Sequence, residues 1–369
     1  MNIKGNIKYI VTGSVIFLAI YMFVAAIPIG PDVSFTPVWT RDISTAPALP
    51  VLGENAKNAA TPESLKKPGL EAFVLGDRLG YFLPDGTIVG STRTDERISA
   101  SSSAWAIYPG DARNTSVHNP DGSLRMTVPG SGYVHVDGDR TYLFIPGGCA
   151  VSQFGPDGKP LWTREHTAPI TAFHSSPAGT VIGYADGLIA CVRSDGTEAF
   201  SFYPGGSNYE IILGAAISED GSLIACVSGI ERQRFILISV KDGQYKIVYH
   251  AWLEGNVREQ AFVDFEKNSA FAFFQTAKGL GILDVKKRSV AFVPIAGRIH
   301  AVGECPGDSL FVALSESEGS YTLSAIERPN HLIAKTTFRA KDAFLIQREK
   351  AVFLGLDQTI SRIDIKGVK

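Results

Sequence analysis

The stretch Gly155–Glu165, GPDGKPLWTRE, contains the pattern that decides the fold. Its Asp-Gly pair lies between two short β-prone runs, Cys149–Phe154 and Pro160–Arg164. A two-residue hairpin turn requires positive φ, which Gly adopts freely and Asp tolerates, so the stretch predicts two antiparallel strands joined by a tight turn. Equivalent turns recur about forty residues apart, at Asp85-Gly86, Asp121-Gly122, Asp195-Gly196 and Asp242-Gly243.

The segments between these turns repeat one order of short apolar runs. Ile170–Phe173 predicts a first strand, and Thr180–Tyr184 predicts a second strand after a turn at Pro177–Gly179. The Asp-Gly turn then joins a third strand to a fourth. A four-stranded unit repeated at this length is typical of a β-propeller blade. No segment after residue 31 has a sustained period of 3.6 residues, so we expect the body of the chain to be all-β.

Counting the turns predicts eight blades. Seven blades is the alternative, because the unit around Ala72–Arg93 lacks an obvious innermost strand. The last unit ends near Ile363–Ile365 without a fourth strand. Phe35–Arg41, FTPVWTR, resembles the fourth-strand sequence Lys159–Arg164, KPLWTR, and would supply the missing strand. Such a closure removes the exposed edges of an open array of sheets.

The chain divides into three predicted regions. Residues 1–31 form a cytoplasmic tip and a signal-anchor helix, residues 32–69 form the closing strand and an Ala/Pro-rich linker, and residues 70–369 form the propeller. The run Tyr9–Pro31 carries no charged residue and is mostly apolar, and as a helix it would span the ~30 Å hydrocarbon core of a bilayer. Residues 9–31 are therefore predicted to contact lipid.

The charges that flank this run predict its orientation. Lys4 and Lys8 precede it and Asp32 follows it, which favours a cytoplasmic N-terminus. We therefore expect a single-pass protein of the cytoplasmic membrane whose propeller lies in the periplasm or outside the cell. The alternative is a signal peptide cleaved at Ala25-Ala26, which would release the propeller as a secreted protein.

The composition excludes several classes of function. Hydrophobic residues make up 45% of the chain and charged residues 20%, which is enough apolar material for a buried core. The formal net charge is −2 and no basic block is present, so a nucleic acid is not expected as a partner. The four cysteines have no zinc-ligand spacing and are expected to be mostly buried apolar residues, with one disulfide between neighbouring blades as the alternative: Cys149, Cys191, Cys226 and Cys305.

No pattern of catalytic residues is recognisable. The seven histidines form neither HxH nor HExxH, and His174-Ser175-Ser176 has no nucleophile elbow around it. Asp137-Gly138-Asp139 lacks the further acidic ligands that a calcium site needs. The chain is thus expected to be neither an enzyme nor a cofactor- or metal-binding protein.

Three loops are predicted to be longer than a blade requires and to share one face of the propeller with Ser207–Tyr209. They are Thr94–Ser103, Gly229–Arg234 and His250–Glu259. The candidate partner-binding residues in these loops belong to types enriched at interface hot spots: Arg97, Tyr209, Arg232, Arg234, Trp252 and Arg258. Plain solvated loops, with Trp252 packed back on its blade, are the alternative interpretation.

The repeated units resemble the quinoprotein (PQQ-type) repeat of eight-bladed propellers. The resemblance covers roughly residues 70–369 and is clearest at Gly183–Tyr203, GYADGLIACVRSDGTEAFSFY, and Cys149–Glu165. In this family a Trp near the fourth strand docks neighbouring blades, and Trp162 and Trp39 fit that position, whereas Met126 and Phe200 take it elsewhere. In plan, the chain is most similar to exported, non-enzymatic BamB-like propellers, although it has no lipid-bearing cysteine.

This resemblance implies a scaffold for partner proteins. Combined with the export segment, it predicts protein–protein scaffolding in a bacterial envelope complex, with an envelope or membrane protein as the partner. The alternatives are a small-molecule or glycan-binding sensor and a quinoprotein-like enzyme, each of which would use the axial funnel of the ring.

Overall fold

The computed structural model describes residues 3–25, 33–49, 68–241, 243–305 and 310–367. The chain forms two units, residues 1–36 with 365–369, and residues 37–364. The first unit contains the helix α1 (Ile3–Ala25). Among the residues that the structure describes, no helix is long and apolar enough to cross a membrane. The spanning helix expected at residues 9–31 is therefore not supported, and residues 26–32 of it lie outside the described residues.

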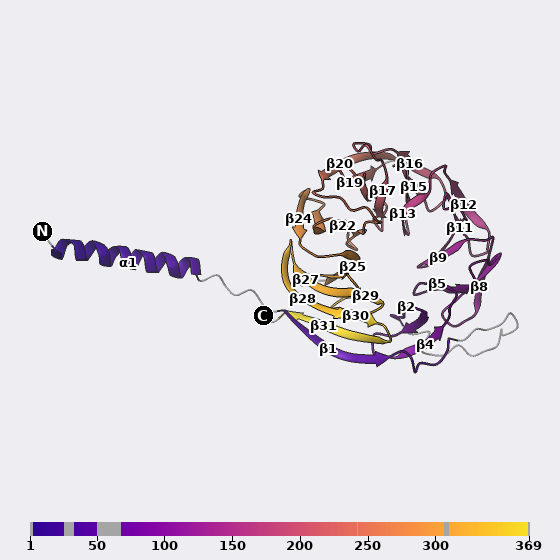
Figure 1. The fold of residues 1–369 in the computed structure, drawn as a ribbon, viewed down its shortest axis with the longest axis horizontal. Coiled ribbons are helices and arrows are strands. Elements are labelled where there is room, and N and C mark those ends of the chain that lie inside the picture. The colour runs from indigo at the N-terminus through magenta and orange to yellow at the C-terminus, as the bar shows by residue number, and fades with distance from the viewer. Residues whose placement is uncertain (1–2, 26–32, 50–67, 242, 306–309, 368–369) are drawn as a thin grey trace. The chain divides into compact units, whose positions relative to one another are not determined.

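The second unit is a ring of eight antiparallel sheets, which we number as blades 1 to 8 along the chain (Figure 1). The strands of the first four blades are: in blade 1, β2 (Glu71–Leu75), β3 (Arg78–Phe82) and β4 (Ile88–Arg93); in blade 2, β5 (Arg97–Ala100), β6 (Trp105–Tyr108), β7 (Asn114–His118) and β8 (Leu124–Pro129); in blade 3, β9 (Tyr133–Asp137), β10 (Arg140–Phe144), β11 (Ala150–Phe154) and β12 (Pro160–Glu165); in blade 4, β13 (Ile170–Ser176), β14 (Gly179–Tyr184), β15 (Ile189–Arg193) and β16 (Glu198–Phe202).

The remaining four blades have the same antiparallel order. Their strands are: in blade 5, β17 (Ile212–Ile217), β18 (Leu223–Ser228), β19 (Arg234–Lys241) and β20 (Gln244–Trp252); in blade 6, β21 (Val263–Phe265), β22 (Phe271–Thr276), β23 (Gly279–Asp284) and β24 (Ser289–Val293); in blade 7, β25 (Arg298–Cys305), β26 (Leu310–Ser317), β27 (Ser320–Glu327) and β28 (His331–Arg339); in blade 8, β29 (Ala343–Arg348), β30 (Ala351–Leu356), β31 (Thr359–Gly367) and β1 (Val33–Asp42). The predicted all-β, eight-bladed propeller is confirmed.

Blade 8 closes the ring with a strand from the other end of the sequence. The sheet order β1-β31-β30-β29 places β1 as the outermost strand, beside β31. The hydroxyl groups of Thr40 and Ser361 lie 2.9 Å apart across this pair. The closing strand expected at Phe35–Arg41 is therefore present.

Blade 1 lacks the innermost strand that the other blades have. Its turn Asp85-Gly86 joins β3 to β4, whereas in blades 2 to 4 the Asp-Gly turn joins the third strand to the fourth. The three strands of blade 1 thus correspond to the second, third and fourth strands of a full blade. Glu71, the first residue of β2, contacts Arg348, the last residue of β29, so β2 runs opposite to the innermost strand of blade 8.

The Asp-Gly turns of blades 1 to 4 are wider than the two-residue hairpins that the sequence predicts. In blade 5 Lys241 pairs with Gln244, so β19 and β20 have the predicted two-residue connection. In blade 3 the amide of Gly158 donates to the carbonyl of Gly155 (3.0 Å), and the amide of Gly155 donates to that of Lys159 (2.8 Å). This pattern is a type I turn followed by a left-handed Gly (φ +72° at Gly158). Asp157 itself does not adopt positive φ. Its carboxylate accepts a hydrogen bond from the backbone amide two residues later (Asp157 Oδ1 to Lys159 N, 3.1 Å).

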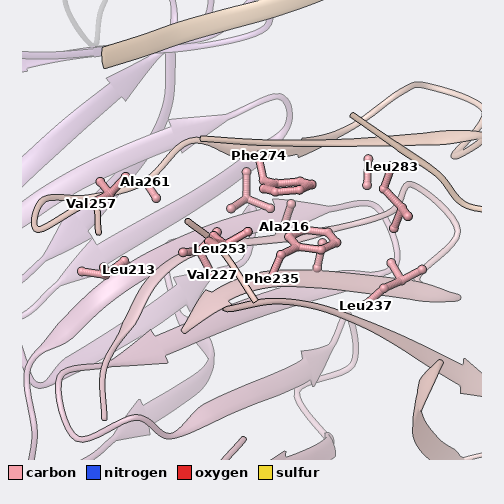
Figure 2. Packing of buried hydrophobic residues seen from close by; sticks show 13 residues of the cluster. Leu213, Ala216, Val227, Phe235, Leu237, Leu253, Val257, Ala261, Phe274 and Leu283 are labelled. Carbon is pink, nitrogen blue, oxygen red and sulfur yellow. The ribbon is translucent and has the colours of Figure 1, made fainter. Parts of the chain in front are cut away.

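The core consists of side chains packed between neighbouring blades. Figure 2 shows one such cluster, in which Phe235 of β19 faces Phe274 of β22. Their rings stack with centroids 3.9 Å apart, and both side chains are fully buried. Cys191, Cys226 and Cys305 are buried in strands as expected, while Cys149 is half-buried, and all four are free thiols. Burial raises the pKa of the Cys226 thiol to about 12.

Candidate functional site

One buried glutamine holds two loops of blade 5 together. Gln233 lies in the loop between β18 and β19, and its side chain is fully buried. Its amide nitrogen donates to the carbonyls of Gly229 and Val257 (both 2.9 Å), and its amide oxygen accepts from the Val257 amide (3.2 Å). The loop after β20 is thereby fixed against the loop 229–233.

The segment 203–210 joins the same group of loops. The amide of Ile230 donates to the carbonyl of Tyr209 (3.2 Å), and the Ser207 hydroxyl donates to the carbonyl of Glu231. Gly206 has φ +88°, and a Cβ on it would lie 3.2 Å from both the Trp252 ring and the Arg234 guanidinium. Glycine at this position therefore lets the backbone lie close against these two side chains.

Two arginines lie over the indole of Trp252. Trp252 ends β20 and pairs across the sheet with Arg234, which begins β19. The Cζ atoms of Arg232 and Arg234 lie 4.9 and 5.5 Å from the ring centroid, within the range of cation–π attraction. Arg234 also donates to the carbonyl of Pro204. Trp252 is still 45% exposed and Tyr209 is 59% exposed, and we name these four residues the Arg–Trp surface: Tyr209, Arg232, Arg234 and Trp252.

The structure separates the other two predicted residues from this group. Arg258 is exposed in the loop that Gln233 fixes, but no described contact joins it to Trp252. Arg97 lies in blade 2, where it donates to the carbonyl of Gly132 (3.5 Å). The prediction of a long loop at Thr94–Ser103 is wrong, because residues 97–100 form β5, the innermost strand of blade 2. Only Ile98 and Ala100 alternate with polar residues in this strand, and three serines follow, so the local sequence did not indicate a strand.

Sequence reasoning missed three exposed apolar residues of blades 4 and 5, namely Tyr203, Tyr245 and Ile247. Among the large hydrophobic side chains that are exposed in the described part of the propeller, five lie between residues 203 and 252: Tyr203, Tyr209, Tyr245, Ile247 and Trp252. The others are scattered over the remaining blades. Tyr245 of blade 5 also stacks on Phe202 of blade 4, with centroids 5.0 Å apart. The apolar residues Tyr245 and Ile247, at alternate positions of β20, were the sequence signal that could have identified this exposed face.

A second feature, which the sequence did not predict, is a cavity of 690 Å³ at the innermost strands of blades 6, 7 and 8. Glu266, after β21, and Glu304, in β25, both line it. Arg328 bonds to both carboxylates, with Nη2 2.5 Å from Glu266 Oε1 and 3.1 Å from Glu304 Oε1. Its guanidinium also lies over the rings of Phe271 and Phe311, at 4.8 and 4.5 Å from their centroids.

The Glu266 carboxyl is chemically unusual. The residue is 3% exposed, and its Oε2 has no hydrogen-bond partner. Burial, reinforced by the neighbouring Glu304, raises the pKa of Glu266 to about 7 even though Arg328 opposes the shift. Across the cavity, Arg348 makes a bidentate pair with Glu71 through Nε and Nη2 (2.5 and 3.0 Å).

Asp264 connects this cavity to a smaller one of 290 Å³ that His174 also lines. Burial raises the pKa of Asp264, and His174, with Nε2 3.8 Å from Oδ1, opposes the shift. In the part of the chain that the structure describes, no group of three or more His, Cys, Asp or Glu side chains is placed to hold a metal ion. Asp137 instead accepts hydrogen bonds from Arg140 and Ser175.

The comparisons with solved structures agree with the observed ring. BamB from Moraxella catarrhalis superposes with a TM-score of 0.61 at 10% identity, covering 90% of this chain and 100% of BamB. The computationally designed Ika8 protein gives 0.57 at 12% identity, covering 80% of this chain and 96% of that one. At these identities the likeness shows the fold alone.

The sequence comparisons identify a relative and a family. An uncharacterized protein of Treponema pallidum (strain Nichols) is 41% identical over 368 residues, which is 100% of this chain and 97% of the relative. A family model described as "beta-propeller protein" matches residues 1–369. The BamB-like plan of the sequence resemblance is thus supported, whereas the assignment to the quinoprotein repeat stays a prediction. The chain belongs to this family of beta-propeller proteins.

Proposed function

We propose that the protein is a scaffold that binds a partner protein through the Arg–Trp surface of blade 5. The observation that carries the proposal is a 45% exposed Trp252 with two guanidinium groups over its ring. Exposed Trp, Tyr and Arg side chains on a rigid support supply most of the binding energy at many protein interfaces. The Gln233 hydrogen bonds supply that support, because they fix the loops on both sides of Trp252.

The partner's chemistry follows from the charges of the surface. Among the described residues, neither Arg232 nor Arg258 forms an ion pair, and both are exposed. An arginine that is stacked on an aromatic ring keeps its donors free for a carboxylate. We therefore expect the partner to present an acidic segment that also carries an apolar side chain for Trp252 and Tyr209.

Site-specific photocrosslinking of the full-length protein in its native cells tests this proposal. A photoreactive phenylalanine analogue at Tyr209 is expected to give one protein adduct whose crosslinked peptide is acidic. The same analogue at Tyr133, which is 44% exposed in blade 3, is the matched control. The adduct is expected to disappear with Arg232→Glu and with Trp252→Ala. Adducts that persist in both variants, or equal adducts from the two tyrosine positions, would contradict the proposal.

The envelope location is also part of the proposal, and the sequence alone supports it. The uncharged run Tyr9–Pro31 after Lys4 and Lys8 has the composition of an export segment, whether it is retained or cleaved. Proteolysis of spheroplasts from cells that express the full chain is expected to degrade the propeller, while a cytoplasmic control protein survives. A protected propeller would contradict export.

A further inference from the structure

The carboxylate-lined cavity between the innermost strands of blades 6, 7 and 8 is not needed for the Arg–Trp surface. We propose that it binds a small organic cation carrying an ammonium group. Three features of the cavity favour such a ligand: the excess of negative charge in its lining, a buried carboxylate oxygen beside it without a hydrogen-bond partner, and the size and apolar content of the space.

Negative charge exceeds positive charge in the lining. The ionisable side chains that line the cavity are five carboxylates, two cations and one histidine: Glu71, Asp264, Glu266, Glu304 and Glu349, with Lys267 and Arg348, and with His300. The His300 Nε2 lies 3.0 Å from Glu316 Oε2, outside the lining. The Arg348 guanidinium is already paired with Glu71. Arg328, which does not line the cavity, supplies one positive charge for the two carboxylates Glu266 and Glu304. One negative charge of this pair is therefore not balanced by an adjacent cation.

The uncompensated charge is at a desolvated position. Glu266 is 3% exposed, its side chain is fully covered, and its Oε2 accepts no hydrogen bond from the described residues or their backbone. A cation in the cavity therefore acts on the Glu266 carboxylate through space, whereas it contacts Glu304, whose side chain is 20% exposed. A buried carboxylate oxygen without a hydrogen-bond partner is energetically unfavourable. Either a proton or a nearby cation relieves this penalty. Because the pKa of Glu266 is raised to about 7, the proton is lost near neutral pH, and a bound cation is then favoured.

The dimensions of the space favour an organic molecule over a bare ion. The cavity volume of 690 Å³ is in the range of small-molecule sites. Apolar side chains form part of the wall, among them Phe262, Phe265 and Leu345. The half-buried phenylalanines offer surface to a hydrocarbon chain, and their rings attract an ammonium group. An anionic ligand would instead meet the carboxylates.

Calorimetric titration of the full-length protein with 1,6-diaminohexane tests the inference, and 1,6-hexanediol is the matched neutral probe. We expect the diamine to bind, the diol to bind at least 10-fold more weakly, and the affinity for the diamine to fall at pH 5.5 relative to pH 8. Glu304→Gln and Glu266→Gln are each expected to weaken diamine binding about 10-fold, the effect of losing one charge interaction of ~1.4 kcal/mol. Glu219→Gln, at an exposed turn of blade 5, is the control and should bind as the wild type does.

Equal affinity for the diol and the diamine, or an affinity unchanged by Glu304→Gln, would overturn the inference. Binding of Ca²⁺ with no binding of the diamine would also overturn it. Glu304 is partly exposed (20% of its side chain), so its variant remains informative if Glu266→Gln fails to fold. Neither result bears on the crosslinks at Tyr209, so this inference and the proposed scaffold fail independently.

Discussion

Trp162 of blade 3 packs directly against Gly196 in the Asp-Gly turn of blade 4. A Cβ on Gly196 would lie 2.9 Å from the Cβ of Trp162, closer than such atoms approach in folded proteins. Trp39 of the closing strand has the same relationship with Gly86 of blade 1, at 2.9 Å from Trp39 Cδ2. The fourth strand of one blade thus docks on the turn of the next.

Gly196→Ala is expected to destabilise the propeller by about 2–4 kcal/mol, since a left-handed alanine is strained and its Cβ displaces Trp162. Gly243→Ala is the control: Gly243 lies in the Asp-Gly turn of blade 5 with φ +74°, but nothing lies within 4 Å of its Cβ position. The control should lose only about 1–2 kcal/mol, the backbone contribution. Equal losses in urea unfolding would show that docking against Trp162 is energetically unimportant.

Trp39→Ala is expected to weaken the closure of the ring and to lower the unfolding free energy by about 3 kcal/mol, in the range for removing a packed aromatic side chain. The indole packs on Phe353 (centroids 6.0 Å apart) and donates to the carbonyl of Pro84 (3.1 Å). Trp252→Ala, at a 45% exposed position, should change stability by less than about 1 kcal/mol. A similar loss in both variants would contradict this assignment of structural and surface roles.

Glu266 makes stability depend on pH. Its pKa is raised from 4.5 to about 7, so the folded protein holds this proton more tightly than the unfolded chain does. The resulting stabilisation is fully present below pH 4.5 and is lost as the pH rises through about 7. Glu266→Gln should remove up to about 3 kcal/mol of this change between pH 4.5 and 8. Parallel stability curves for the wild type and the variant would exclude a raised pKa.

Arg328→Ala should destabilise the protein by about 3–5 kcal/mol, the usual effect of leaving a buried charge without its partner. The variant leaves Glu266 and Glu304 facing each other and removes the guanidinium that lies over the rings of Phe271 and Phe311. Adding Glu266→Gln should restore part of the loss. A double variant no more stable than Arg328→Ala in denaturant unfolding would show that the loss comes from packing alone.

The sequence was sufficient for features that depend on local chemistry. The Asp-Gly turns and the strand at Phe35–Arg41 follow from short patterns, and the resemblance to a family repeat implied the blade-docking positions of Trp39 and Trp162. The structure contains each of these features. The turn type was wrong in blades 1 to 4, because there the Asp side chain binds a backbone amide, which stabilises a type I turn. The blade 5 turn has the predicted two-residue length. No short pattern distinguishes these two turns.

The candidate sites depended on contacts between distant residues. Gln233 connects loops through Val257, and Arg328 joins Glu266 to Glu304 over 62 and 24 positions of the chain. Nothing local in the sequence marks such partners. Arg97 was assigned to a loop because the short innermost strand in which it lies, β5, was not recognised from its sequence.

The strand that closes blade 8 has a consequence for biosynthesis. Thr40 and Ser361, which face each other across β1 and β31, are 321 positions apart, so β1 leaves the ribosome long before its partner exists. During that interval the edge that β31 will cover remains available for pairing with other chains. Completion of the ring is thus the last step that the order of translation permits, and a chain that stops before residue 359 retains two open edges.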